Sequence, residues 1–264
     1  MERIARLNAS QKPGRPFSRL WSTLPAALMA ALLAAACSWL CPFSSYAGGY
    51  AGEHAGETAR IDIGTVAIPY AVPEGLAGVK DIFPLNLKVL DEEFNMDTRV
   101  FGMYVPKAYL NERAADPDAL PGYYLQLCHD AFFLSHSLGE TSFFLLCGAV
   151  ETVLARQYAK ERFREKFGAV FSEAVGMPVR ITSLSYQGLL EREPLRRTMF
   201  GSGKACVTTS RGETEFPFAV ATTLHMTGGK VLCTIQIGRT PEAKALEAFR
   251  REAPATAKAV WGWQ

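Results

Sequence analysis

Residues Glu215 to Gly238 read EFPFAVATTLHMTGGKVLCTIQIG, and this stretch decides the fold. Apolar side chains alternate along both of its halves, which is the pattern of strands that bury one face. Gly228-Gly229 separates the halves and supplies the positive φ angles that a two-residue hairpin turn requires. The stretch therefore predicts a β-hairpin within a sheet, and the side chains expected to be buried are Phe218, Val220, Leu224 and Ile235.

Further strands come in consecutive runs on both sides of one long helical pattern. The runs before it are Ile61 to Ile68, Arg99 to Val105 and Tyr123 to Cys128, and those after it are Val179 to Leu184, Leu195 to Phe200 and Lys204 to Thr209. Strands that follow one another in sequence favour antiparallel pairing. We therefore expect an α+β fold, with a largely antiparallel sheet covered by helices.

Two helical segments are expected to cover the sheet. The first spans 142–175, where apolar residues recur at three- and four-residue steps. A straight helix of this length would be about 50 Å long, too long for a compact domain, so we expect a bend near Phe167-Gly168. The second spans 241–253, between a Thr240 cap and Pro254. Lys107 to Gly122 is expected to be a polar loop with at most one helical turn.

The first 47 residues differ in character from the rest. Five basic residues precede an uncharged apolar run, and Ser45-Tyr46-Ala47 provides a small-x-small cleavage site. This pattern predicts a bacterial export signal over 1–47, a flexible lead over 48–60 and a single α+β domain over 61–264. Two alternatives stay open: residues 20–41 are long enough to remain as a membrane anchor, and Cys37 is a possible lipidation site. All three place the domain outside the cytoplasm, in the periplasm or secreted.

The charge balance argues against a nucleic-acid partner. The whole chain has a formal charge of +2, but five of its 28 Lys and Arg residues and one of its 26 acids lie in 1–47. The remainder carries a formal charge of −2, so the basic excess comes from the leader. Nucleic-acid binding needs a basic patch on the folded domain.

The four cysteines after the leader are Cys128, Cys147, Cys206 and Cys233, and each lies in an apolar or strand-like run. Export permits disulfides, but free cysteine also packs as a small hydrophobic residue. We expect at least two of these thiols to be free and buried. Their spacing matches no zinc motif.

Several short motifs suggest chemistry but have simpler explanations. Cys128-His129-Asp130 contains a nucleophile next to a base, yet neighbours on a strand point to opposite faces. His136 and Glu140 could join His129 and Asp130 around a metal, but the spacing matches no known metal motif. His225 is expected to be structural or solvated. We therefore assign no catalytic, cofactor-binding or metal-binding residue.

Two basic motifs are treated in the same way. Gly201-Ser202-Gly203-Lys204 lacks the first glycine and the final hydroxyl of a phosphate loop, so we expect a turn. Arg192, Arg196 and Arg197 form a basic cluster that Glu191 and Glu193 dilute, which favours a solvated strand edge over an anion site.

The pattern as a whole resembles the PsbP-like superfamily of α/β/α sandwiches. The features that carry the resemblance are a Val-Pro-Glu-Gly turn at Val72 to Gly75, a helix beginning at Ser142-Phe143, a hairpin with an apolar last strand over Gly229 to Ile237, and a terminal helix. The resemblance spans Ile61 to Trp261 and implies a non-catalytic accessory or binding domain.

These observations predict an exported accessory or binding protein with an unknown protein or small-molecule partner in the cell envelope. One alternative is an envelope enzyme whose site assembles from distant residues such as His129, Asp130 and His225. Another is a membrane-anchored domain that docks on a larger envelope complex.

Overall fold

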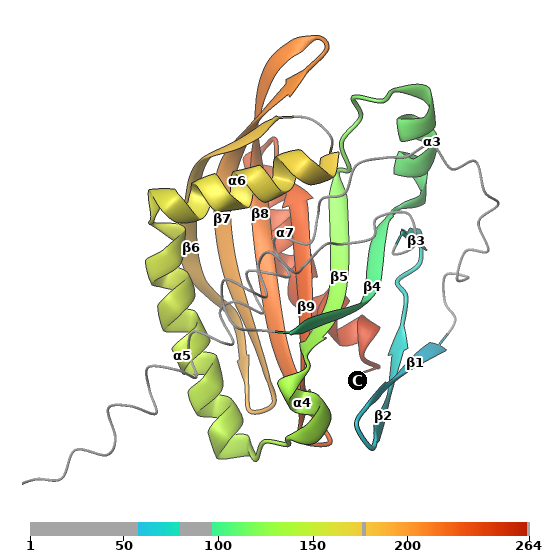
Figure 1. Ribbon diagram of the computed structural model, residues 1–264, viewed down its shortest axis with the longest axis vertical. Helices are drawn as coiled ribbons and strands as arrows, with labels where there is room; N and C mark the ends of the chain where they lie inside the picture. Colours follow the sequence, from blue (N-terminus) through green and yellow to red (C-terminus); the bar gives the residue numbers. More distant parts are fainter. Residues whose placement is uncertain (1–57, 80–96, 176–177, 263–264) are drawn as a thin grey trace, which may run out of the picture.

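The computed structural model describes residues 58–79, 97–175 and 178–262 (Figure 1). The expected export signal and most of the expected flexible lead lie outside these residues. Within them, no helix is both long and apolar enough to cross a bilayer.

A seven-stranded sheet forms the centre of the molecule, in the order β3-β4-β5-β9-β8-β7-β6. Every neighbouring pair is antiparallel. The strands are β3 (Leu76–Gly78), β4 (Thr98–Pro106), β5 (Tyr123–Asp130), β6 (Val179–Glu193), β7 (Arg196–Thr209), β8 (Gly212–Thr227) and β9 (Lys230–Arg239). The fold is therefore α+β with an antiparallel sheet, as the sequence predicts.

The sheet consists of two blocks of strands that are consecutive in sequence, and one strand pair, which we call the seam, joins the two blocks. Strands β3 to β5 form one block, and the meander from β6 to β9 forms the other. The seam is the pairing of β5 with β9, where Tyr123 is opposite Gly238 and Cys128 is opposite Cys233.

Strands β8 and β9 form the predicted hairpin at the middle of the sheet. Thr227 pairs with Lys230 across a turn in which Gly228 and Gly229 have φ angles of 55° and 74°. Positive φ at both central residues matches the right-handed twist of the strands. The four side chains expected to be buried, Phe218, Val220, Leu224 and Ile235, are all in the main core.

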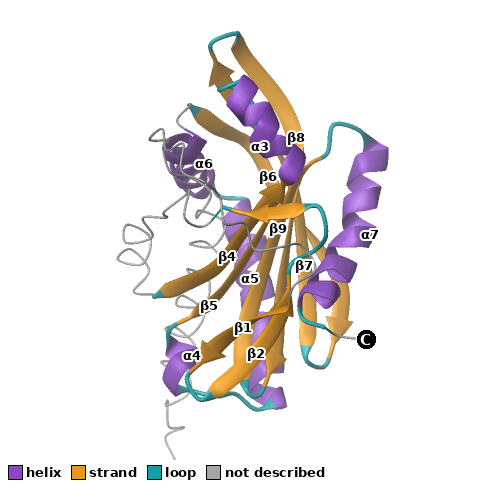
Figure 2. Cartoon of the chain, turned by 90° about the vertical axis from the view of Figure 1, so that its right-hand side faces the viewer, coloured by secondary structure: helices purple, strands orange, loops and turns teal. Residues whose placement is uncertain are grey.

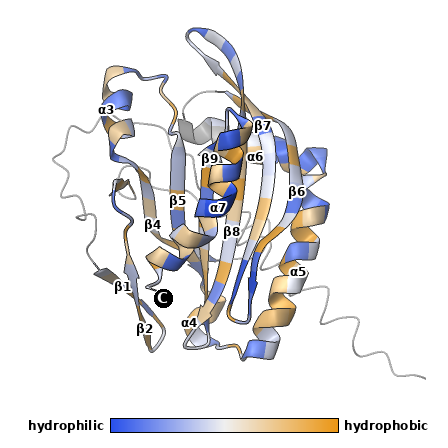
Figure 3. Ribbon diagram, turned by 180° about the vertical axis from the view of Figure 1, so that it is seen from behind, coloured by the Kyte–Doolittle hydropathy of each residue, from blue (hydrophilic) through white to orange (hydrophobic). Residues whose placement is uncertain are grey.

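Helices cover both faces of the sheet. Helix α5 (Glu140–Tyr158) and helix α6 (Glu161–Val175) pack against β6 on one face, and α7 (Ala243–Val260) packs on the other face (Figures 1 and 2). Seen from behind, α7 lies in front of β8 and β9 (Figure 3). Two shorter helices, α3 (Lys107–Ala115) and α4 (Phe132–Ser135), flank β5 in sequence.

The long helical segment is divided at a different place from the one predicted. α5 ends at Tyr158 and α6 begins at Glu161, whereas Gly168 lies inside α6. A Cβ atom at Gly168 would lie 3.0 Å from the carbonyl oxygen of Val179. The glycine therefore permits close packing of α6 on β6, and does not mark a bend.

The predicted turn at Gly201-Ser202-Gly203 is also wrong, because β7 runs continuously through it. A Cβ atom at Gly203 would lie 2.2 Å from the carbonyl oxygen of Ser183, and one at Gly201 would lie 2.6 Å from the Tyr158 ring. These glycines permit close approach by β6 and α5. Similarly, β6 extends to Glu193, nine residues beyond the predicted end at Leu184.

The last helix differs from the prediction at both ends. It starts at Ala243, with Glu242 at the N-cap in place of Thr240, and it continues through Pro254 to Val260. Its buried residues Phe249, Ala253, Ala257 and Val260 span the proline and hold both halves of α7 on the sheet. Burial of this apolar stripe outweighs the proline's lost backbone hydrogen bond.

Three differences concern the N-terminal half. The expected strand Ile61 to Ile68 is a separate hairpin of β1 (Thr58–Ile63) and β2 (Val66–Ala71), so β1 also includes the end of the expected flexible lead. The expected polar loop Lys107 to Gly122 contains the nine-residue helix α3. Helix α4, which follows β5, was not expected.

Candidate functional site

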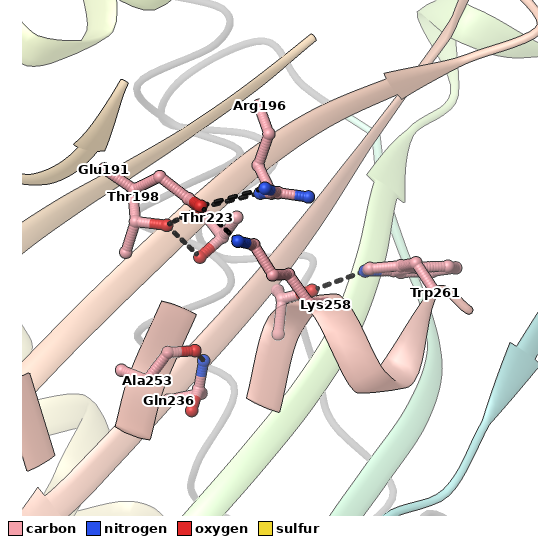
Figure 4. A network of polar contacts seen from close by, with 9 residues as sticks. Glu191, Arg196, Thr198, Thr223, Gln236, Ala253, Lys258 and Trp261 are labelled. Atoms are coloured by element: carbon pink, nitrogen blue, oxygen red, sulfur yellow. Dashed lines mark hydrogen bonds and ion pairs between the residues drawn. The ribbon is translucent and has the colours of Figure 1, made fainter. Parts of the chain in front are cut away.

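The most extensive polar cluster in the described residues lies between the sheet and α7 (Figure 4). Its centre is Glu191 on β6, whose carboxylate accepts hydrogen bonds of 2.7 and 2.8 Å from the guanidinium of Arg196 on β7. Lys258 of α7 reaches the same carboxylate at 3.1 Å. The Glu191 and Arg196 side chains are only 11 and 8% exposed, so this is a buried, bidentate ion pair.

The electrostatics of Glu191 follow from these contacts. Burial alone would raise the pKa of Glu191, but hydrogen bonds and charges from Arg196 and Lys258 outweigh it and lower this pKa. The carboxylate is therefore ionised at neutral pH. Thr198 lies 3.5 Å from it and shares a 3.0 Å hydrogen bond with Thr223 on β8, which continues the network into the sheet.

A second group of hydrogen bonds fixes the rest of α7 to the sheet. Trp261 donates its indole N–H to the hydroxyl of Thr234 on β9 at 2.9 Å. Gln236 donates its amide to the carbonyl oxygen of Ala253 at 2.7 Å and accepts a hydrogen bond from the hydroxyl of Tyr123 at 2.8 Å. These buried groups satisfy one another across the helix–sheet interface, as a structural polar layer requires.

His225 lies beside this layer and is almost completely buried. Its ring centroid is 4.5 Å from that of Trp261, and its register partner on β7 is Arg196. Burial, with a smaller contribution from the charge of Arg196, lowers the pKa of His225 to about 3. The imidazole is therefore neutral at physiological pH, which fits the structural role offered by the sequence and not the solvated one.

The structure does not assemble His129, Asp130 and His225 into one group. Asp130 accepts a hydrogen bond from the backbone N–H of Phe132 at the start of α4, at 2.7 Å. His129 is buried, which lowers its pKa, and its Nδ1–H donates to the carbonyl oxygen of Asp130 at 3.1 Å. The ring of Phe101 lies 6.2 Å from His129 and 6.0 Å from Trp261, so aromatic side chains bridge the space between the two histidines.

The other motif residues are also separated. Cys128 is opposite Cys233 and His129 is opposite Arg99, so the cysteine and the histidine occupy opposite faces of β5. His136 stacks on Phe132 with 4.0 Å between ring centroids, and Glu140 lies in the first turn of α5. Among the described residues, no three His, Cys, Asp or Glu side chains gather as metal ligands would.

All four described cysteines are free and buried. This agrees with the prediction of at least two free thiols. Burial, opposed in part by the charge of Arg197, raises the pKa of Cys147 to about 12, so its thiol is protonated and unreactive at neutral pH.

The basic cluster is not the solvated strand edge that the sequence suggests. Arg192 is exposed, but Arg196 and Arg197 are both buried. Glu191 and Arg196 point toward α7, whereas the Arg197 guanidinium lies 4.7 Å from the ring of Phe144 on α5. The alternation of side chains along β6 and β7 thus divides the cluster between the two faces of the sheet.

The exposed large hydrophobic side chains come from one short stretch of the chain. Among the described residues, the large hydrophobic side chains that remain exposed are Phe132, Leu134, Phe144 and Leu145, each 40 to 53% accessible. They come from α4 and the first turns of α5, two helices joined by residues 136–139 at one end of the molecule (Figures 1 and 3). We call these four residues the α4–α5 apolar surface. Alternation and helical periodicity predict core residues, and this surface has no comparable signal in the sequence.

Comparison of the sequence with models of known protein families and with curated proteins finds no match in either set.

Proposed function

We propose that this protein is an exported, non-catalytic accessory or binding protein that acts in the cell envelope through the α4–α5 apolar surface. The leader pattern of residues 1–47 supports export, and the resemblance to PsbP-like domains supports an accessory role. A membrane-anchored domain that docks on a larger envelope complex would use the same surface.

The observation that carries the proposal is the position of the exposed apolar side chains. All four lie within the 14 residues from Phe132 to Leu145, although the described chain covers most of the domain. Isolated exposed hydrophobic residues are ordinary, but a cluster of them marks an interaction site. Aromatic side chains are also enriched in the centres of protein interfaces.

The polar groups of the interior support the same function. The layer under α7 contains the Glu191–Arg196 ion pair, a hydrogen bond between Thr198 and Thr223, and the indole N–H of Trp261 that donates to Thr234. A catalytic site instead needs a nucleophile, base or ligand set arranged around an accessible position. The candidate residues for such a site, His129, Asp130 and His225, contact different parts of the structure.

The test is site-specific photo-crosslinking in the intact cell envelope. A photoreactive residue replaces Leu145 on the α4–α5 apolar surface, and a matched control replaces Lys244, which is exposed on α7. We expect a discrete adduct from position 145 that excess unlabelled domain suppresses, and none from position 244. Equal, unsaturable labelling from both positions would show that this surface has no specific partner. The mature N-terminus in the envelope fraction, measured by mass spectrometry, tests export.

A further inference from the structure

Side chains alternate between the two faces of the sheet along β6 and β7. Arg192 and Arg197 therefore lie on one face, whereas Glu191 and Glu193 lie on the other. Arg192 is directly opposite Arg197, and Glu193 is directly opposite Arg196. Directly opposed residues of an antiparallel pair point to the same face. Glu191 pairs with Arg196 on the α7 face. Neither acid of β6 therefore lies on the α5 face, where the nearby acid is Glu151 of α5, whose charge acts with that of Arg197 on Cys147 and Tyr186.

Arg197 is a buried cation without an anionic partner. Its residue surface is 3% exposed, and its Nε atom is buried with no hydrogen-bond acceptor. Within the part of the chain that the structure describes, no ion pair or hydrogen bond reaches this guanidinium, and its close contact is with the Phe144 ring. An uncompensated buried charge is costly, and a like charge opposite adds to the cost. This arrangement would be relieved by a bound anion.

The surroundings of the arginine pair indicate what kind of anion fits. Phe144 contacts Arg197 from one side and is half exposed on the other, so it connects the pair to the α4–α5 apolar surface. The acids that α5 contributes nearby are Glu140 and Glu151, and neither forms an ion pair with Arg192 or Arg197 in the described residues. A ligand that fits this site carries an oxyanion group next to an apolar group.

We propose that the exposed Arg192, with the positive charge of the buried Arg197 opposite it, binds the phosphate group of an anionic phospholipid, with the α4–α5 apolar surface placed against the lipid bilayer. Guanidinium groups bind phosphate oxygens through paired N–H donors. A phospholipid supplies the phosphate and the apolar body in one molecule, and exposed Phe and Leu side chains are typical of helices that lie in a membrane interface. This inference rests on the proposed function, because it names the partner of the same surface.

The experiment is flotation of the purified domain with vesicles of phosphatidylglycerol or phosphatidylcholine. We expect binding to the anionic vesicles, much weaker binding to the neutral ones, and weakening as salt is raised. Arg192→Gln should bind anionic vesicles about five-fold more weakly, which corresponds to about 1 kcal/mol for one basic residue near such a surface. Leu145→Ser should also weaken binding, and Glu140→Gln should strengthen it.

Controls distinguish phospholipid binding at this site from general electrostatic attraction and from binding of free phosphate. Arg180→Gln removes an exposed arginine at the other end of β6 and should bind like the wild type. Arg197→Lys keeps the buried positive charge opposite Arg192 and should bind like the wild type, and its melting curve shows that it folds. Equal affinity for both vesicle types, wild-type binding by Arg192→Gln, or release of bound vesicles by millimolar inorganic phosphate would each overturn the proposal.

The two proposals fail in different ways. If position 145 crosslinks saturably to a protein and the domain does not float with anionic vesicles, the binding function stands and the lipid site is overturned. If the domain neither floats nor forms a saturable adduct, both are overturned. Adducts of phospholipid mass from position 145 would support both.

Discussion

His225 should make this protein lose stability as the pH falls from 7 to 5, and removing it should reduce that loss. In the folded protein, burial and the nearby Arg196 lower the pKa of His225 to about 3, whereas an unfolded histidine titrates near 6.5. Between these values the unfolded chain binds more protons than the folded one. The free energy of unfolding therefore falls with falling pH, by about 2 kcal/mol from pH 7 to pH 5 for this group alone.

The variant His225→Gln keeps a polar side chain but cannot titrate in this range. Its free energy of unfolding, measured by urea denaturation at pH 7 and pH 5, should change by about 2 kcal/mol less than that of the wild type. Any constant cost of the substitution cancels in this double difference. Staying at or above pH 5 also limits the contribution of the carboxylates, which titrate mainly below it.

The matched control is His136→Gln, which removes an exposed histidine and leaves the buried His225 in place. If His225→Gln showed the full wild-type pH dependence, the folded protein would accept a proton at His225 near neutral pH. The account of a neutral imidazole held beside Trp261 would then be wrong.

Four further predictions test the interior. Glu191→Gln should destabilise the domain by about 3 kcal/mol because it breaks a buried ion pair, whereas Lys258→Gln, at the half-exposed end of the same network, should cost under about 1 kcal/mol by thermal or urea denaturation. Ile235→Ala should cost about 2 to 4 kcal/mol, and a change of only a few tenths would show that this face is not core. Gly203→Ala should cost about 1 to 3 kcal/mol, since its Cβ would meet the Ser183 carbonyl oxygen; unchanged melting would mean that β6 can move away. Thiol titration of residues 48–264, in denaturant and without reductant, should count four thiols, and a count of zero would establish two disulfides.

The central hairpin could be predicted because every local signal agrees. Alternation along Phe218, Val220 and Leu224 selects the buried face, and Gly228-Gly229 selects the turn. Strand residues on both sides of the long helical segment are predicted for the same reason, although Ile61 to Ile68 is a separate hairpin and the two runs over 195–209 are one strand. Consecutive strands favour antiparallel pairing. Together these signals determined the fold class without any long-range information.

Glycine and proline misled the prediction where tertiary contacts decide the local structure. Gly168 predicts a bend and Gly201 and Gly203 predict a turn, but in the structure each permits a close approach between packed elements. Pro254 was expected to end the last helix, but residues on both sides of it are buried against the sheet. The sequence shows where a residue lacks a Cβ atom or a backbone N–H group. It does not show which neighbouring element packs against that residue in the folded protein.

The candidate site was partly visible in the sequence. The three arginines form a cluster in the sequence, but only the structure shows that Arg196 pairs with Glu191 while Arg197 faces Phe144. Phe144 itself is 53 residues before Arg197 in the chain, and no periodicity links them. The exposure of the α4–α5 apolar surface likewise depends on where the sheet ends, which a linear pattern does not contain.

The seam between β5 and β9 has a consequence for how the chain reaches this structure. Cys128 and Cys233 face each other there although they are 105 residues apart in sequence, while each hairpin of the β6 to β9 meander closes through a turn of two residues. Long loops close slowly, so the meander is expected to form first and β3 to β5 to join it last. During synthesis from the N-terminus, β5 has no partner on this side until β9 has been made, and until then its unpaired edge is open to misassembly. Pulsed hydrogen exchange during refolding would show the order directly, with protection of β8 preceding that of β5.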